Sequence, residues 1–231
     1  MNMRGKFVVL DGADGVGKDT QADRLLAAAH QQGISAALIR YPGYERTLTG
    51  KVVQSYLRGE YGELDTVHPK IATYLFATDR FELKAELEQL LATHDLVIAS
   101  RYAASNLAFQ TARVPEVERP AFRDWVLQLE YGTFSAIKED AVIFLSLPTA
   151  LSEKLIAKRQ QAAAVQSRDI YDEHKAFQLT VLEQYHILCS MFDHWRKIEC
   201  EQGDDIRSIE DIGAEIQQLV FEQILAPVEV A

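Results

Sequence analysis

The sequence predicts an α/β fold in which a parallel sheet of five strands is covered by helices on both faces. Short runs rich in β-branched and aromatic residues alternate with helical patterns along the chain, which is typical of βαβ units. The runs are almost continuously apolar, as expected for strands that are buried on both faces. A glycine-rich loop follows the first run and opens a helical pattern. The predicted strands are residues 6–11, 34–41, 95–100, 140–147 and 195–201.

Length and composition predict a single domain over residues 1–231. A hydrophobic share of 48% and a charged share of 25% are those of an ordinary soluble globule. The net charge of -10, without a dense lysine or arginine run, argues against a nucleic-acid partner. An anionic substrate would have to be bound by a few individually positioned cationic side chains. No apolar run approaches the ~18 residues of a membrane span, and the first apolar stretch is too short for a signal peptide. We therefore expect a cytoplasmic protein that does not bind membranes.

The segments between the predicted strands show helical patterns. Asp19 to Gln32 begins with an acidic residue, which suits the positive end of a helix dipole, and stops at Gly33. Residues 69–93 form a long periodic segment. A buried stripe on a C-terminal helix is predicted from apolar residues spaced three or four apart: Ile206, Ile209, Ile212, Ile216 and Leu219. A small polar patch flanked by basic residues predicts a flexible lid over about residues 158–170.

Two cysteines, Cys189 and Cys200, have no metal-like spacing and are interpreted as reduced packing residues.

Residues 12–20 read GADGVGKDT and resemble the phosphate-binding loop G-x-x-x-x-G-K-[ST]. The strand, loop and helix that this motif requires are all predicted here. Glycines let backbone N–H groups approach phosphate oxygens, the helix N-terminus adds positive potential, and Lys18 reaches the transferring phosphate. A plain turn into a helix would leave Lys18 without a role. The expected nucleotide-binding residues are Gly12, Ala13, Asp14, Gly15, Val16, Gly17, Lys18, Asp19 and Thr20.

Asp19 departs from this motif, because it occupies the position of the serine or threonine hydroxyl. A carboxylate next to phosphates is repelled unless a cation lies between them. Carboxylate oxygens are good ligands for magnesium. We therefore expect Asp19 to bind Mg²⁺ directly.

Motifs in the rest of the chain indicate which phosphate chemistry is involved. The segments LFATDRFE (75–82) and SRYAASNLAFQTAR (100–113), together with the phosphate loop, resemble the thymidylate kinase family of P-loop nucleoside monophosphate kinases. Its corresponding segments look like F-x-x-x-R on a long helix and D-R-Y-x-x-S-x-x-A-[FY] after the third strand. LQLEYGTF (127–134), AVIFLSLPTALSEKLIAKR (141–159) and RDIYDEH (168–174) continue the similarity, which covers nearly the full length in the right order.

The resemblance implies transfer of the ATP γ-phosphate to dTMP, giving dTDP and ADP for dTTP synthesis. Phe76 and Arg80 are four residues apart and share a helix face. By resemblance, Phe76 stacks on the pyrimidine and Arg80 donates to its 4-carbonyl, which disfavours cytosine. Taken alone, Phe76 is more readily interpreted as a core residue and Arg80 as part of a surface ion pair, and the family resemblance reverses this preference.

A second helical segment carries more of the implied substrate site, formed by Ser105, Asn106, Phe109 and Gln110. Asn106 or Gln110 is expected to read the N3 edge of thymine, and Phe109 to crowd the ribose 2′ position. Asp14 aligns with a family carboxylate that accepts from the sugar 3′-OH.

Arginines are expected at the phosphates. Arg101 is expected to clamp the dTMP phosphate, with Arg46 as a second clamp, although related sequences carry arginine nearer the proline, where this chain has Gly43. Gly15 stands where one branch of the family has a catalytic arginine. The charge that stabilises the transferring phosphoryl group is therefore expected from the lid, from Arg159 and Arg168 first and Lys158 next.

Ser100 is a second departure, because the family usually has aspartate at this strand end, supporting magnesium through water. In phosphate-loop folds positions 19 and 100 face each other across the metal. We therefore hypothesise an exchange, with Asp19 as the anionic ligand and Ser100 as its hydrogen-bonding partner. Thr20 is a fallback hydroxyl.

Two other functions are compatible with the motifs. A polyphosphate-dependent nucleotide kinase also has a loop resembling D-x-x-G-K-D, but the Phe76/Arg80 and Ser105/Asn106 set is not expected there. A non-catalytic nucleotide-binding homologue would explain two altered metal positions. The resemblance also implies a homodimer packed through helices.

Overall fold

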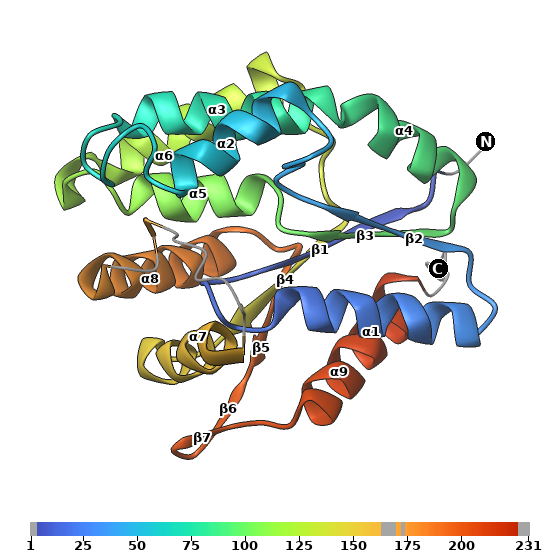
Figure 1. Ribbon diagram of the computed structural model, residues 1–231. Coiled ribbons are helices and arrows are strands. Elements are labelled where there is room, and N and C mark those ends of the chain that lie inside the picture. The colour runs from blue at the N-terminus through green and yellow to red at the C-terminus, as the bar shows by residue number, and fades with distance from the viewer. Residues whose placement is uncertain (1–3, 163–169, 172–173, 226–231) are drawn as a thin grey trace.

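The computed structural model describes residues 4–162, 170–171 and 174–225, with only the backbone of residues 157–162. Its centre is a five-stranded sheet in the order β2-β3-β1-β4-β5, in which all paired strands are parallel (Figure 1). The strands are β1 (Lys6–Asp11), β2 (Ala36–Arg40), β3 (Leu96–Ser100), β4 (Ala141–Ser146) and β5 (Trp195–Glu199). The predicted fold class is confirmed, and each strand lies within its predicted range.

Helices cover both faces of the sheet (Figure 1). One face carries α1 (Lys18–Gln31), α7 (Thr149–Ala162) and α9 (Ile209–Gln218). The other carries α2 (Leu48–Leu57), α3 (Pro69–Glu82), α4 (Lys84–Thr93), α5 (Ala103–Thr111), α6 (Arg119–Leu127) and α8 (Lys175–Met191). Short 3₁₀ and π segments complete the helices at Glu116–Glu118, Gln128–Thr133 and Leu219–Ile224. Along the described parts of the chain, no helix is long and apolar enough to cross a membrane.

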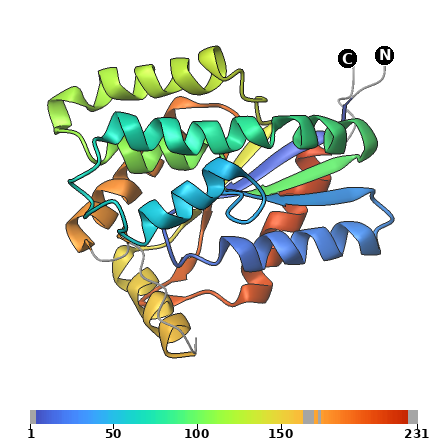
Figure 2. The same ribbon diagram turned by 45° about the horizontal axis from the view of Figure 1, so that its top comes forward.

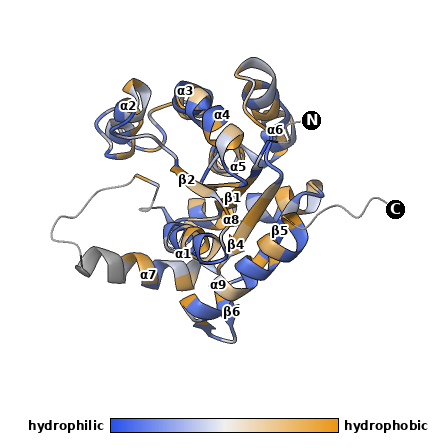
Figure 3. Cartoon of the chain, turned by 90° about the vertical axis from the view of Figure 1, so that its right-hand side faces the viewer, coloured by the Kyte–Doolittle hydropathy of each residue, from blue (hydrophilic) through white to orange (hydrophobic). Residues whose placement is uncertain are grey.

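The two cores follow from the alternation of side chains along each strand. In β1, Phe7 and Val9 enter the core beneath α3, α5 and α8, whereas Val8 and Leu10 enter the core beneath α1 and α9. All four side chains are fully buried. Figure 3 shows the strands mainly in the hydrophobic colour between helices of mixed colour. Each strand must therefore be apolar at successive positions, because its side chains enter a core on both faces of the sheet. This is why continuous apolar runs predicted the sheet correctly.

Two segments differ from the sequence expectation. The predicted helix over residues 69–93 is divided at Leu83, whose backbone has φ −91° and ψ −1° and whose side chain is buried. The C-terminal stripe is only partly buried, because Ile206 lies in a short hairpin of β6 (Glu201–Gln202) and β7 (Asp205–Ile206), and Ile209 is 50% exposed at the start of α9. The remaining three stripe residues, Ile212, Ile216 and Leu219, are buried as expected.

The strand order places a crevice at the carboxyl end of β1. This strand lies between β3 and β4, and the helices that follow β1 and β3, α1 and α5, cover opposite faces. Ligands of open α/β sheets bind where successive connections diverge in this way. Figure 2 shows α7 (gold) beside the loop that joins β1 to α1. The chemistry of the molecule is therefore expected around residues 11–20 and the end of β3.

Candidate active site

The loop between β1 and α1 has the backbone of a phosphate-binding loop. Gly12, Gly15 and Gly17 have φ values of 153°, 79° and 88°, a region that favours glycine. A Cβ on Gly12 would lie 2.6 Å from the carbonyl oxygen of Leu145, so the loop runs directly against β4. Helix α1 begins at Lys18 without a side-chain cap, which leaves its first N–H groups directed at a ligand site.

Lys18 is folded back over this loop and is 7% exposed. Its Nζ donates to the carbonyl oxygen of Ala13 at 2.6 Å. Burial lowers the pKa of Lys18 to about 8, with a further lowering by Arg101 that Asp14 and Asp11 oppose. An anion bound in the loop would raise this pKa again, because it stabilises the charged ammonium.

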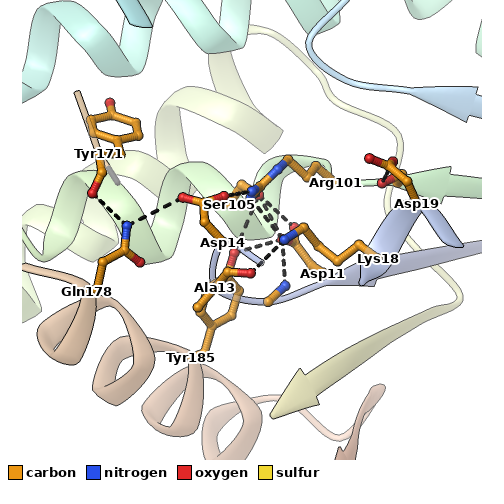
Figure 4. A network of polar contacts seen from close by, with 12 residues as sticks. Asp11, Ala13, Asp14, Lys18, Asp19, Arg101, Ser105, Tyr171, Gln178 and Tyr185 are labelled. Atoms are coloured by element: carbon orange, nitrogen blue, oxygen red, sulfur yellow. Dashed lines mark hydrogen bonds and ion pairs between the residues drawn. The ribbon is translucent and has the colours of Figure 1, made fainter. Parts of the chain in front are cut away.

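Arg101, directly after β3, lies at the centre of the crevice (Figure 4). It has φ 64°, which is uncommon for a residue with a side chain and typical of strained functional positions. Its guanidinium pairs with Asp14, donates to Ser105 Oγ at 3.1 Å and lies 5.3 Å from the centre of the Phe109 ring. Burial, the largest single influence, would lower the pKa of Arg101, but Asp14, Tyr185 and Asp11 together outweigh it and raise that pKa.

Asp11 at the end of β1 holds the crevice together, and the sequence analysis missed it. Its fully buried carboxylate accepts from Ser105 Oγ at 2.7 Å and from Tyr185 on α8 at 2.7 Å. It also accepts from the backbone N–H of Gly12 at 2.9 Å and lies 3.8 Å from Arg101 Nη1. An acidic residue that ends a buried strand just before a glycine loop was the available signal.

Gln178 on α8 was also missed. Its Nε2 donates to the backbone oxygen of Tyr171 at 2.7 Å and lies 3.5 Å from Asp14 Oδ2 (Figure 4). The amide therefore ties the phosphate loop to the short described segment 170–171. Its partners are 7 and 164 residues away along the chain, so sequence spacing gave no signal.

Asp19 and Ser100 do face each other, as the sequence analysis expected. Ser100 Oγ donates to Asp19 Oδ1 at 2.6 Å, and the Asp19 side chain is 73% exposed. Arg40, which is paired in register with Ser100, approaches the same carboxylate at 3.7 Å and Asp23 at 2.5 Å. Thr20 is exposed on α1. Position 19 therefore offers a carboxylate at the first turn of the helix.

A pocket opens beside Arg101; the space outside protein atoms there is about 520 Å³, part of which is open solvent. Aromatic rings form its walls: Phe76 stacks on Tyr171 with ring centres 6.5 Å apart, and Phe109 lies 5.4 Å from Tyr171. Eight of the nine predicted substrate residues line it: Asp14, Phe76, Arg80, Arg101, Ser105, Asn106, Phe109 and Gln110. Tyr44 and Tyr171 also line the pocket and were not predicted.

The polar end of this pocket is built on Glu130. Arg80 is 5% exposed and makes a two-pronged ion pair with Glu130, through Nε at 3.1 Å and through Nη2. Asn106 Nδ2 donates to Glu130 Oε1 at 2.6 Å and to the Thr73 carbonyl at 3.0 Å. Asn106 Oδ1 is buried and has no partner among the described residues. The interpretation of Arg80 as part of a surface pair is thereby excluded.

Gln110 is distinguished from Asn106 by its partners. Its Nε2 donates to the Tyr171 hydroxyl at 2.8 Å, and its Oε1 accepts from Arg113 at 2.8 Å. Both ends of the amide are thus used within the protein. Of the two candidates for the N3 edge, Asn106 has the vacant acceptor.

Arg46 does not lie at the pocket. A turn in which its N–H donates to the Gly43 carbonyl at 2.8 Å directs it toward α4, where its guanidinium pairs with Glu86. The turn is held by Asp79, which accepts from the Gly43 N–H at 2.9 Å. The expected second phosphate clamp is therefore not assembled by this residue.

The predicted lid falls largely outside the described residues. Arg168 is not among the described residues, and only the backbone of Lys158 and Arg159 is described. The base of α7 is described, and it packs against the phosphate loop. A Cβ on Gly15 would lie 2.7 Å from Ile156 Cγ1 and 2.9 Å from the Ser152 carbonyl oxygen. Position 15 therefore has no room for a side chain such as arginine.

Comparisons with known proteins agree with this geometry. The family model described as thymidylate kinase matches residues 10–208. The thymidylate kinase of Danio rerio is 31% identical over 219 residues, covering 94% of this chain and 90% of the relative. The probable thymidylate kinase of Thermococcus gammatolerans is 31% identical over 227 residues, covering 96% and 99%.

A solved structure supports the fold independently of close sequence similarity. The thymidylate kinase of Candida albicans superimposes with a TM-score of 0.70 at 21% identity, covering 95% of this chain and 92% of that one. Taken with the family model and the relatives above, the phosphate loop, the aromatic pocket and the strand-end arginine lead to one conclusion: this chain belongs to the thymidylate kinase family.

Proposed function

We propose that this protein transfers the γ-phosphoryl group of ATP to dTMP, giving dTDP and ADP. The observation that carries the proposal is the vacant acceptor Asn106 Oδ1, buried in the pocket that Arg80 also lines. Thymine has a 4-carbonyl that accepts from a guanidinium and an N3–H that donates to such an oxygen. Cytosine has the opposite pattern at both atoms. A pocket with a buried polar group rejects ligands that leave this group unpaired.

The remaining pocket residues fit a deoxynucleotide in one orientation. Phe76 and Tyr171 offer flat apolar faces to a base next to Asn106. Phe109 lies between this end and Arg101, where it limits the space for a ribose 2′-hydroxyl, and Asp14 lies beside Arg101 as an acceptor for the 3′-OH. The substrate phosphate then points to Arg101, which is held in place by Asp14 and Ser105.

ATP is assigned to the loop of residues 12–20, across the crevice from the pocket. The loop N–H groups and Lys18 bind phosphate oxygens, and Lys18 gains its full charge when phosphates replace the Ala13 carbonyl as its partner. Arg101 and Lys18 together stabilise negative charge on the transferring group, which is the main requirement of phosphoryl transfer. The lid cations Arg159, Arg168 and Lys158 remain predicted contributors.

The residues at the first turn of α1 fit a magnesium ion. Asp19 supplies an exposed carboxylate, and Ser100 holds it by a 2.6 Å hydrogen bond, so the donor set is oxygen only. In the parts of the chain that the structure describes, no cluster of three His, Cys, Asp or Glu side chains could hold a metal. Magnesium typically takes one or two protein carboxylates and completes its shell with water and substrate phosphates, whose charge it neutralises.

The polyphosphate-dependent nucleotide kinase is not favoured, because the family model and the relatives that match most of this chain are thymidylate kinases. The function is tested with a coupled ADP-release assay on dTMP, dUMP, dCMP and dGMP with ATP and magnesium. We expect turnover of dTMP and at least about 100-fold lower kcat/KM for dCMP, because two hydrogen bonds are lost at about 1.4 kcal/mol each. Comparable turnover of dCMP, use of polyphosphate alone, or tight dTMP binding without turnover would contradict the proposal.

The exchange of positions 19 and 100 is tested with single and double variants. Asp19→Ser and Ser100→Asp are each expected to lower magnesium-dependent kcat by about 10-fold or more, because one removes the carboxylate and the other puts two carboxylates in contact. The double variant restores one carboxylate and one hydroxyl and is expected to recover much of the activity. Asp23→Ser, on the same helix face, is the matched control with little effect. If Asp19→Ser retains full activity, the exchange is refuted.

We further propose a homodimer formed through α2 and α3. Large apolar side chains at helical spacing are exposed on these adjacent helices: Leu48, Val52, Ile71, Tyr74 and Phe81. Large exposed apolar side chains gathered on neighbouring helices mark a protein interface more often than scattered ones do. A second copy of the chain buries the same surface in a two-fold arrangement.

Light scattering after gel filtration tests the dimer. Wild-type protein is expected at twice the chain mass of 26.0 kDa. Ile71→Asp is expected to give the monomer, because a charge in an apolar interface remains unpaired. Ile209→Asp is the control, since this residue is similarly exposed but lies on α9 across the sheet. A wild-type monomer, or an unchanged mass for Ile71→Asp, would disprove this interface.

A further inference from the structure

Glu130 lies behind the base pocket and is not one of the residues that line it. Its side chain is 0% exposed, and its carboxylate joins Arg80 to Asn106, the two residues that face the base in the proposed function. We infer that Glu130 is a positioning residue that determines the base preference of the enzyme, because it decides which end of the Asn106 amide faces the pocket. The inference rests on the proposed function.

An asparagine amide has two orientations of similar shape but opposite hydrogen-bonding character. Both N–H groups of Asn106 meet acceptors, the Glu130 carboxylate at 2.6 Å and the Thr73 carbonyl at 3.0 Å. The opposite orientation would place Oδ1 against the same two acceptors. Oδ1 therefore lies on the other side of the amide, where it is buried and has no partner among the described residues. In the proposed function the N3–H of thymine donates to it.

The ion pair with Arg80 requires Glu130 to act as a hydrogen-bond acceptor. A guanidinium only donates hydrogen bonds, so Glu130 must present acceptors to it. The ionised carboxylate has enough lone pairs to accept from Arg80 and from Asn106 simultaneously. A neutral glutamine has a single acceptor oxygen, whereas in the carboxylate Oε1 accepts from both Asn106 Nδ2 and Arg80 Nη2 and Oε2 accepts from Arg80 Nε. In either amide orientation the glutamine Nε2 faces a donor, Arg80 Nε or Asn106 Nδ2, so one of the two residues that face the base in the proposed function is mispaired.

The backbone around Glu130 is specialised for this placement. Helix α6 widens into a π-helix over Gln128–Thr133, which brings Glu130 to full burial between α3 and α5. Such wide turns interrupt helices mostly at functional sites. A buried carboxylate that only neutralised Arg80 would need no contact with Asn106.

The two roles differ in what they do to substrate preference. If Glu130 acts only through Arg80, its loss changes the ratio of kcat/KM for dTMP to that for dCMP by the same factor whether or not the Asn106 amide is present. If Glu130 orients Asn106, its loss changes this ratio only when the Asn106 amide is present. This ratio is measured in one preparation and does not depend on the fraction of folded enzyme.

The experiment compares this ratio in wild type, Glu130→Gln and Glu139→Gln. Glu139 is the matched control: it is also buried and accepts from Tyr131 at 3.0 Å, yet it has no hydrogen bond to Arg80 or Asn106 among the described residues. We expect the ratio to fall at least about tenfold in Glu130→Gln, the cost of one mispaired buried group, and to stay within about twofold in Glu139→Gln. An unchanged ratio in Glu130→Gln overturns the inference.

A double-mutant cycle tests whether Glu130 acts through Asn106. In an Asn106→Ala background, Glu130→Gln is expected to leave the ratio unchanged, and a further tenfold fall there would overturn the inference. If Glu130→Gln is not recovered in soluble form, Glu130→Asp replaces it. Its shorter carboxylate cannot reach both Arg80 and Asn106, so the ratio is again expected to fall, and an unchanged ratio counts against the inference.

The failure of this inference is distinguishable from failure of the proposed function. Wild-type enzyme that does not prefer dTMP overturns both. Wild-type enzyme that prefers dTMP, with the same preference in Glu130→Gln, overturns only the role of Glu130.

Discussion

The active site depends on the buried carboxylate of Asp11, where β1, α5 and α8 meet. Ser105 and Tyr185 both donate to it at 2.7 Å, and Arg101 lies 3.8 Å away. A buried charge is tolerated only when it is paired and hydrogen-bonded, so each of these partners is held in place by the same requirement. Because Arg101 in turn pairs with Asp14, the phosphate loop and the end of β3 are fixed relative to each other.

Helix α5 connects the carboxylate of Asp11 to the end of the pocket where the base is proposed to bind. Ser105 contacts Asp11 at one end of the pocket, and the next residue, Asn106, contacts Glu130 on the opposite side. Phe109, one turn further, lies under Arg101. In the proposed function, one short helix thus positions groups for the phosphate, the sugar and the base, which is more precise than placing them on separate loops.

The fold and much of the site could be predicted from local patterns. Apolar runs located the five strands of the main sheet, and the glycine loop with its helix located Lys18, because both signals arise within a few neighbouring residues. The four-residue spacing of Phe76 and Arg80 placed both on one helix face, and the resemblance to thymidylate kinases placed that face at the pocket that both residues line. The partners of these residues could not be predicted: Glu130 is 50 residues from Arg80, and Tyr185 is 174 residues from Asp11. Arg46 was misplaced because the turn held by Asp79 directs it to Glu86.

The central claim is that Asn106 Oδ1 accepts the N3 proton of thymine. Nuclear magnetic resonance of ¹⁵N-labelled dTMP bound to the protein tests it most directly. The N3–H signal, which exchanges with water in the free nucleotide, should become protected and visible in the complex and should be lost with Asn106→Ala. A complex of bound dTMP without a protected N3–H signal, or a signal that persists in Asn106→Ala, would contradict the account.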